Sequence, residues 1–368
     1  MHPAVTLALA ALAVAHPISN KQGDCLVSLG DRPYYIINNM TNGPLKDKLL
    51  SCQNKPVTIT DFTIGHRGGG TLQFPEETKQ AEDTGARMGA DITIDEYSSL
   101  CGKQDGFNVF ARTPHDYQSG TPNCCTELYD TCGKVLTLNE YIDLVDSYPG
   151  YRNFTPELKT PPPQVPMPFK GYTQQQYAQD FVDTFRKKNI DSSRIWPQSF
   201  LYEDIVYWLK NDHDFGRQAI YLQEFDTPED LAAGMKNLSI AKAAGVNIIG
   251  PSIHMLVAPG GLNNKSIVPS AYANAIKQNG LDIIAWTYER SGPLATVKAR
   301  DEYYSSTIAN ITYYDGQYYE LLDVLANQIK IKGLFTEWAD TVTYFANCFG
   351  LNCPLGWSYE WILVCFLW

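Results

Sequence analysis

A histidine and an arginine follow a short apolar segment directly, in the sequence TIGHRGGG at residues 63–70. His66 can carry a proton near neutral pH, and Arg67 can clamp two oxygens of a phosphodiester at once. The glycine run is followed by PEET at 75–78, which is typical of the start of a helix. This pattern suits chemistry on a phosphate ester. A lone His-Arg-Gly is more often an ordinary loop, so the interpretation needs partners elsewhere in the chain.

Glu157 and Lys159 are the first such partners. One residue separates them on a predicted strand, so their side chains point to the same face. Carboxylate oxygens suit Ca²⁺ or Mg²⁺, and a lysine ammonium is a compact charge for a phosphoryl oxygen. The pair is also consistent with a purely structural ion pair. Trp286, at the end of another predicted strand, can either pack in the core or line a substrate pocket.

The elements that position these residues alternate along the chain from about residue 136. A capping box at 137–140 begins one helix, and aromatic residues at spacing i, i+4, i+8 mark another at 177–185. The Pro-rich run at 160–168 predicts a loop. Strands are predicted at 154–158, 194–196, 219–222, 246–249, 282–286 and 334–336, and further helices after Thr227-Pro228, at 272–277 and at 321–329.

Strands that alternate with helices predict an α/β fold with a parallel sheet whose faces are covered. With the short apolar segment before His66 counted as a strand, seven strong strands without a GxGxxG turn favour a TIM (β/α)₈ barrel over a doubly wound sheet. In such a barrel, functional groups lie at the carboxyl ends of the strands. Polar residues collect at these predicted ends: His66 and Arg67, Glu157 and Lys159, Gln198 and Ser199, Trp286 and Thr287, Thr336 and Glu337. The sequence therefore predicts one shared site.

Composition limits the partners and the compartment. The 368 residues carry a formal net charge of −11, which argues against nucleic acid or an anionic membrane surface as a partner. Residues 1–15 read as a secretory signal peptide with Ala13-Val14-Ala15 as the cleavage site, and a buried N-terminal helix is the alternative. Nine cysteines favour an oxidising compartment. We therefore expect a secreted protein without a stable membrane span.

Cysteines and sequons add to this expectation. Four cysteines cluster in one loop-rich stretch, which predicts disulfide stapling, and their spacing does not fit a zinc site. These are Cys101, Cys124, Cys125 and Cys132. Five Asn-x-Ser/Thr sequons predict a glycoprotein and begin at Asn39, Asn153, Asn237, Asn264 and Asn310.

Five segments in order resemble the glycerophosphodiester phosphodiesterase family, and most of all its secreted fungal branch. They are GHRGGGTLQFPEET, FTPELKT, WPQSF, IIAWTYERSGPL and LFTEWADTVTYFANC, and the similarity extends over about residues 55–351. The resemblance implies a TIM barrel that hydrolyses small glycerophosphodiesters to glycerol 3-phosphate and an alcohol with a divalent cation, Ca²⁺ or Mg²⁺. Position by position, it implies catalytic roles for His66 and Lys159, substrate contacts for Arg67 and Trp286, a metal ligand in Glu157 and a supporting role for Glu76.

One part of the family pattern does not match. After the first helix, family members have a strand with Glu-x-Asp, both metal ligands, and then His-Asp, the second acid/base. This chain instead continues from GARMGA (85–90) into DITIDEYSS, with Ile94 and Glu96 at the expected positions. There are two explanations. In the first, Asp95 or Glu96 replaces the metal ligands and His115 replaces the second acid/base. In the second, a block of roughly fifty residues is absent after Ala90. The second explanation is favoured, because the following segment resembles the Cys-rich insertion of fungal relatives.

The last residues, 352–368, are expected to be an atypical apolar tail. The run at 361–368 is too short to span a membrane, and a membrane or GPI anchor is the less favoured interpretation. With the Glu-x-Asp and His-Asp groups missing, we expect phosphodiesterase activity to be impaired. The alternative is a catalytically silent secreted barrel that at most binds phosphodiesters.

Overall fold

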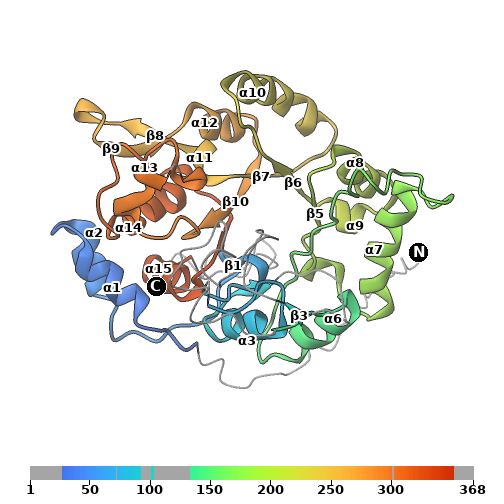
Figure 1. Ribbon diagram of the computed structural model, residues 1–368, viewed down its shortest axis with the longest axis horizontal. Coiled ribbons are helices and arrows are strands. Elements are labelled where there is room, and N and C mark those ends of the chain that lie inside the picture. Colours follow the sequence, from blue (N-terminus) through green and yellow to red (C-terminus); the bar gives the residue numbers. More distant parts are fainter. Residues whose placement is uncertain (1–26, 72, 93–100, 103–132, 301, 352–368) are drawn as a thin grey trace, which may run out of the picture.

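A parallel sheet forms the centre of the molecule in the computed structural model, which describes residues 27–351 apart from 72, 93–100, 103–132 and 301 (Figure 1). Its order is β2-β1-β11-β10-β7-β6-β5, and every pairing between neighbours is parallel. The strands are β1 (Thr63–Gly65), β2 (Asp91–Ile92), β5 (Gln198–Ser199), β6 (Ile220–Gln223), β7 (Ile248–Pro251), β10 (Asp282–Tyr288) and β11 (Gly333–Thr336).

An eighth segment extends this sheet beyond β5. Phe154 forms a parallel bridge with Ile195, and Glu157 forms one with Gln198. The strand predicted at 154–158 is therefore present as two single bridges. It forms one edge of the described sheet, and β2 forms the other.

The sheet curls around an inner cluster of side chains. Strands far apart in the sheet order contribute to this one cluster, which a flat sheet would not allow. Layers of side chains from several strands are typical of the interior of a (β/α)₈ barrel. The cluster contains Ile64, Trp196, Ile220, Leu222, Ile248, Ile284 and Phe335. The described part of the chain is thus a curled parallel sheet, consistent with the predicted fold class.

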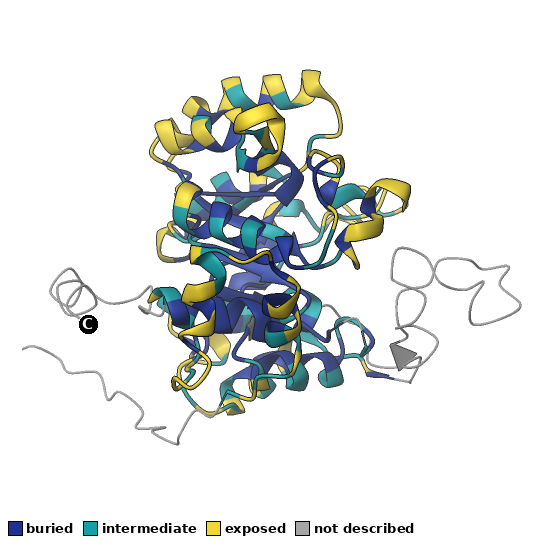
Figure 2. Ribbon diagram, turned by 90° about the vertical axis from the view of Figure 1, so that its left-hand side faces the viewer, coloured by how far each residue is buried: buried dark blue, intermediate teal, exposed yellow. Residues whose placement is uncertain are grey.

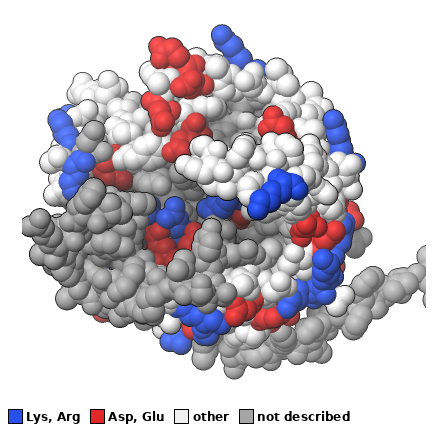
Figure 3. Space-filling model, turned by 45° about the vertical axis from the view of Figure 1, so that its right-hand side comes forward, with Lys and Arg blue, Asp and Glu red and all other residues white. Residues whose placement is uncertain are grey.

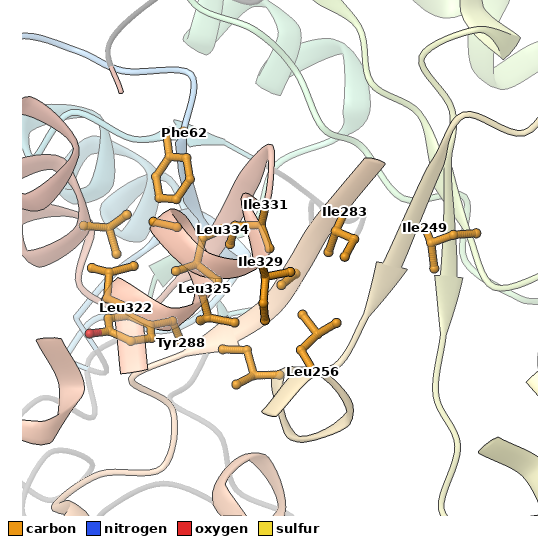
Figure 4. Close-up of a cluster of buried hydrophobic side chains, with 14 of the residues drawn as sticks. Phe62, Ile249, Leu256, Ile283, Tyr288, Leu322, Leu325, Ile329, Ile331 and Leu334 are labelled. Atoms are coloured by element: carbon orange, nitrogen blue, oxygen red, sulfur yellow. The ribbon is translucent and has the colours of Figure 1, made fainter. Parts of the chain in front are cut away.

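Helices surround the sheet on the outside (Figures 1 and 2). They are α3 (Lys79–Arg87), α6 (Leu138–Ser147), α7 (Gln174–Lys187), α8 (Tyr202–Asn211), α9 (His213–Gly216), α10 (Pro228–Ala243), α11 (Ile253–Leu256), α12 (Ala271–Gln278), α13 (Val297–Arg300), α14 (Gln317–Asp323) and α15 (Ala339–Phe349). A π-helix, Val324–Ile329, continues α14. Figure 4 shows the second core, in which strand residues such as Ile283 and Leu334 pack against Leu325 and Ile329 of this π-helix. Full burial of each such side chain contributes about 1.5–3 kcal/mol.

Helix starts were predictable from local chemistry. Thr137 and Glu140 form the predicted capping box of α6, and Thr227 caps α10 ahead of Pro228. The strand predicted at 194–196 is present only as the single bridge of Ile195 with Phe154, because Asp191 accepts a hydrogen bond from the amide of Ser193 and starts a 3-10 turn that ends at Arg194. Pairing with β6 begins at β5. The helix predicted at 321–329 begins earlier, at Gln317.

Two N-terminal helices pack on the barrel and were not expected from the sequence. They are α1 (Arg32–Asn39) and α2 (Pro44–Leu50). A disulfide joins Cys52, after α2, to Cys348 in α15. Arg32 forms an ion pair with Glu289 and lies 4.1 Å above the ring of Trp338. These contacts fix the segment before residue 55 to the carboxyl ends of β10 and β11.

The described residues also form two antiparallel pairs: β3 (Cys101–Gly102) with β4 (Gly133–Lys134), and β8 (Val257–Gly260) with β9 (Ser266–Pro269). No helix within the described ranges is long and apolar enough to cross a membrane.

Several expectations lie outside the described residues. They concern the signal peptide at 1–15, the tail at 352–368, the candidate substitutes Asp95, Glu96 and His115, and Cys124, Cys125 and Cys132. The main chain of β2 runs beside β1, with Gly65 paired to Ile92, so Asp91–Ile92 occupies the place of a second strand. The residues that follow Ile92 are not described, and the two explanations for the altered segment stay open.

Candidate functional site

A pocket of about 290 Å³ lies at the carboxyl ends of the strands. This is near the lower limit of the ~300–1,000 Å³ usual for small-molecule sites. Five of the six predicted site residues line it, and the sixth, Glu76, lies directly behind them. The lining residues are His66, Arg67, Glu77, Glu157, Lys159, Gln198, Phe200, Leu222, Glu224, Trp286, Tyr304 and Phe335. Acidic and basic side chains lie together near the centre of one face of the molecule (Figure 3).

A tight turn after β1 presents His66 and Arg67 to this pocket. The backbone is left-handed at Arg67 (φ 46°), Gly68 (φ 96°) and Gly69 (φ 68°). A side chain at Gly68 would place its Cβ only 2.8 Å from the Cβ of Ala81 in α3, so glycine allows the turn to approach the helix. The amide of Gly69 donates to the carbonyl of His66 at 2.7 Å and closes the turn. The glycine run therefore allows the turn after β1 to pack against α3 and to place His66 and Arg67 at the pocket.

Glu337 holds His66. The distance from Nδ1 of His66 to Oε1 of Glu337 is 2.7 Å, and Glu337 is only 1% exposed. Burial lowers the pKa of His66, although the Glu337 charge acts in the opposite direction. His66 is thus neutral at neutral pH. With Nδ1–H donated to the carboxylate, Nε2 is left as the proton acceptor.

A chain of ion pairs runs from Glu337 through Arg290 and Glu76 to Arg67. Arg290 donates to Oε1 of Glu337 at 2.9 Å and to Glu76, and Arg67 Nη1 donates to Oε2 of Glu76 at 2.5 Å. Burial would raise the pKa of Glu76, but the charges of Arg290 and Arg67 outweigh it and hold this pKa well below its usual range. Glu76 therefore has the supporting position that the resemblance implied. Arg290 carried no signal in the sequence, whereas Glu337 was marked by its place at a predicted strand end.

The Glu157–Lys159 pair lines the same pocket as Arg67. Nζ of Lys159 donates to Oε2 of Glu157 at 2.8 Å, so the ion pair exists and both partners also line the pocket. Both charges act on Glu77, which packs on the Arg67 side. Burial raises the pKa of Glu77, while Lys159 and Arg67 oppose the rise. The curl of the sheet thus brings the charged residues that follow β1 close to those of the Glu157 edge.

The described residues do not form a site for the expected divalent cation. Within the described ranges, no three His, Cys, Asp or Glu side chains come close enough to hold a metal ion. Glu157, the expected ligand, is bonded to Lys159. A hard cation requires six or more oxygen ligands, and one carboxylate supplies too few. These residues alone therefore do not fit the divalent cation that the resemblance implies.

Aromatic side chains also line the pocket. Trp286 is half-buried, and its Nε1 donates to the carbonyl of Gly250 at 2.8 Å. Its ring lies 5.8 Å from that of Phe200 and 6.1 Å from that of Tyr304, both nearly perpendicular to it. Only Trp286 of these three was singled out in the sequence. Phe200 is the last residue of the WPQSF segment and directly follows β5, but Tyr304 lies in a short 3-10 helix, Tyr303–Ser305, that no pattern indicated.

Comparisons with known proteins were made for sequence and for structure. No protein-family model matches the chain. Among solved structures, a putative glycerophosphoryl diester phosphodiesterase from Silicibacter pomeroyi aligns with a TM-score of 0.48 and 13% identity, covering 82% of this chain and 98% of that one. A glycerophosphodiester phosphodiesterase from Parabacteroides distasonis aligns with a TM-score of 0.41 and 10% identity, covering 78% of this chain and 99% of that one.

A sequence relative gives a firmer result. The extracellular protein of Arthroderma benhamiae is 43% identical over 250 residues, which are 67% of this chain and 100% of that protein. Because the match extends over the whole relative at this identity, the chain belongs to the same family as the Arthroderma benhamiae extracellular protein.

Proposed function

We propose that the pocket binds the phosphate of a small glycerophosphodiester outside the cell, in a TIM barrel of the phosphodiesterase type, and hydrolyses it to glycerol 3-phosphate and an alcohol at a reduced rate. One observation carries the proposal. His66, oriented by Glu337, shares a single pocket with two cationic side chains, Arg67 and Lys159. The motif resemblance and the extracellular name of the relative support the substrate class and the location.

Each residue has a defined part in the proposed reaction. Arg67 and Lys159 stabilise the negative charge that develops on the phosphoryl oxygens. Nε2 of His66 accepts a proton from the attacking water, whose oxygen forms the new bond to phosphorus as the bond to the alcohol oxygen breaks. Glu77, whose pKa is raised by burial and which lines the same pocket, is the candidate that protonates the leaving alcohol. Trp286 limits the space for the alcohol.

The resemblance still implies a divalent cation, and among the described residues Glu157 is the ligand that it implies. The proposed roles of Arg67, Lys159 and His66 do not depend on it. Without the Glu-x-Asp and His-Asp groups, the chain is expected to turn over slowly, because loss of one proton-transfer partner alone costs ~10²–10⁴-fold in rate.

The test is the purified protein with glycerophosphocholine, followed by phosphorus NMR with EDTA, Ca²⁺ or Mg²⁺. Slow release of glycerol 3-phosphate that disappears in His66→Ala would support the proposal. Calorimetric binding of glycerol 3-phosphate that disappears in Arg67→Ala, without any turnover, would favour the silent barrel. Absence of both binding and turnover would refute both functions.

A restored chain provides the second arm of the test. Inserting the Glu-x-Asp and His-Asp block of a family member after Ala90 is expected to raise turnover by at least 100-fold with a saturating cation. Equal turnover by both proteins would contradict the missing-block explanation and point to Asp95, Glu96 and His115 as working substitutes. Transcript sequence across the codons for Ala90 and Asp91 checks the same point independently.

A further inference from the structure

A second cavity, of about 590 Å³, lies between α10 and the outer face of β6. Its volume is within the ~300–1,000 Å³ usual for small-molecule sites. Ile220 and Leu222 belong to the inner cluster of the sheet, so Tyr221 between them points outward, and it lines this cavity. We call it the α10 cavity. It is distinct from the pocket that contains Arg67, although Glu224 lines both.

The helix α10 has two faces with different surroundings. Leu231 and Leu238, two turns apart, lie on the face that packs against the hydrophobic core. Ala233, Asn237 and Ile240 follow the same helical spacing on a second face, which lines the cavity. Ile240 is 62% exposed, so this second face is open to solvent rather than packed. The cavity is therefore a gap in the helix packing whose wall is partly apolar.

One of the sequons lies in the wall of the α10 cavity. Asn237, which begins the sequon at 237–239, is exposed and lines the cavity. A glycan on Asn237 therefore starts inside the cavity, and its innermost sugars have a high effective concentration there. The other exposed sequons lie on other elements and do not line this cavity; they begin at Asn39, Asn264 and Asn310.

The lining suits a carbohydrate. Tyr202 and Tyr221 are half-buried, their ring centroids lie 5.4 Å apart, and such rings offer apolar surface to the C–H face of a sugar ring. The exposed carboxylates of Glu224 and Asp230 can accept hydrogen bonds from sugar hydroxyl groups. No Lys, Arg or His is among the described residues that line the cavity, so a phosphorylated ligand finds no cation there. An acyl chain would bury the two carboxylates without partners.

We propose that the α10 cavity is a carbohydrate site and that its occupant is the N-linked glycan of Asn237, bound through its two innermost N-acetylglucosamine residues. In the modification, the amide nitrogen of Asn237 forms a bond to C1 of the first sugar as the bond from C1 to a lipid-linked diphosphate breaks, and one amide proton is released. Phe225 packs on Gly234 and fixes the first half of α10. The bound sugars fix the second half and cover Ile240. This inference does not depend on the proposed function.

The first measurement is the melting temperature of the full-length protein secreted by a eukaryotic host, with the occupancy of each sequon checked by mass spectrometry. Ser239→Ala removes the sequon but keeps Asn237, and alanine is the better helix former, so helix propensity alone would raise the stability. Loss of the glycan is instead expected to lower the melting temperature by about 2–4 °C. Ser266→Ala removes the sequon of Asn264 in the same way and is the matched control, with no change expected. An equal or higher melting temperature for Ser239→Ala would overturn the proposal.

The second measurement is the enzymatic release of each glycan from the folded protein by peptide N-glycosidase. Sugars packed in a cavity are shielded, so release at Asn237 is expected to be about 10-fold slower than at Asn264, and the difference should vanish after unfolding. Tyr202→Ala removes one ring of the lining and should abolish most of the difference, whereas Tyr202→Phe keeps the ring and the protection. Equal rates at the two sites in the folded wild type would contradict the packing of the sugars in the cavity.

Two other occupants would show themselves in the same experiments. If Asn237 is unmodified and the protein is a dimer by light scattering, a second copy covers the cavity and the proposal fails. If Asn237 is unmodified in a monomer, the cavity is left to a free ligand and the proposal fails as well. Glycerol 3-phosphate should bind equally to Ser239→Ala and the wild type, because Arg67 and Lys159 do not line this cavity, so this proposal and the proposed function can fail separately.

Discussion

Glu289 is expected to make the fold less stable as the pH rises. It is 1% exposed and paired with Arg32, yet burial outweighs that partner and raises its pKa from 4.5 to about 7. A folded-state pKa above the unfolded value gives stability that is complete below pH 4.5 and is lost as the pH rises through 7. The change from 4.5 to about 7 corresponds to about 3 kcal/mol.

Replacing this carboxylate isolates its contribution. Glu289→Gln resembles the protonated side chain, so the variant should match the wild type near pH 4.5 and exceed its free energy of unfolding by about 3 kcal/mol at pH 8. Burial lowers the pKa of His66, but His66 is present in both proteins and cancels in the difference. Asp340, whose pKa burial raises to about 6, also raises the pKa of Glu289, so relief of this repulsion is part of the gain expected in Glu289→Gln. Glu203→Gln, an exposed glutamate of α8, is the control.

Urea unfolding followed by tryptophan fluorescence at pH 4.5, 6 and 8 provides the measurement. A variant that is less stable than the wild type by the same amount at every pH would refute the reasoning. That result would mean that Glu289 is ionised throughout this range and that its pairing with Arg32 outweighs the cost of burial.

Three further predictions concern the site, the surface and the covalent link. Glu337→Gln should reduce turnover by about 10–100-fold and move the acidic limb of the pH–rate profile to lower pH, because the Glu337 charge raises the pKa of His66, while glycerol 3-phosphate still binds. Asn153 is 4% exposed, so mass spectrometry after enzymatic deglycosylation should find it unmodified and find glycans only among the exposed sequons, Asn39, Asn237, Asn264 and Asn310. The double variant Cys52→Ala and Cys348→Ala should lose about 3–5 kcal/mol of unfolding free energy, because the bond closes a loop with a sequence separation of 296.

The sequence was informative wherever a local pattern determines structure. The capping box at Thr137 fixed the start of α6, and the alternation of strand and helix signals indicated a parallel sheet. The placement of Glu157 and Lys159 at one strand end was enough to expect them beside His66. These features depend on residues within a few positions of each other or on a general rule of the fold.

Contacts between residues far apart in the sequence could not be predicted in this way. Arg290 joins Glu76 to Glu337 across sequence separations of 214 and 47, and Tyr304 reaches the pocket from a short 3-10 helix. Nothing near Arg290 in the sequence identifies Glu76 and Glu337 as its partners, and only the fold brings them together. The link from α1 to the residue that follows β10 is likewise made by one long-range ion pair, that of the partly buried Arg32 with Glu289.

The bond between Cys52 and Cys348 also has a consequence for the order of events during synthesis. Cys348 lies in the last helix that the structure describes, so almost the entire barrel must leave the ribosome before the two sulfurs can meet. Until then, in an oxidising compartment, Cys52 can form non-native disulfides with the cysteines that emerge before Cys348. Production of correctly paired protein should therefore depend on a disulfide isomerase more strongly than on the rate of oxidation.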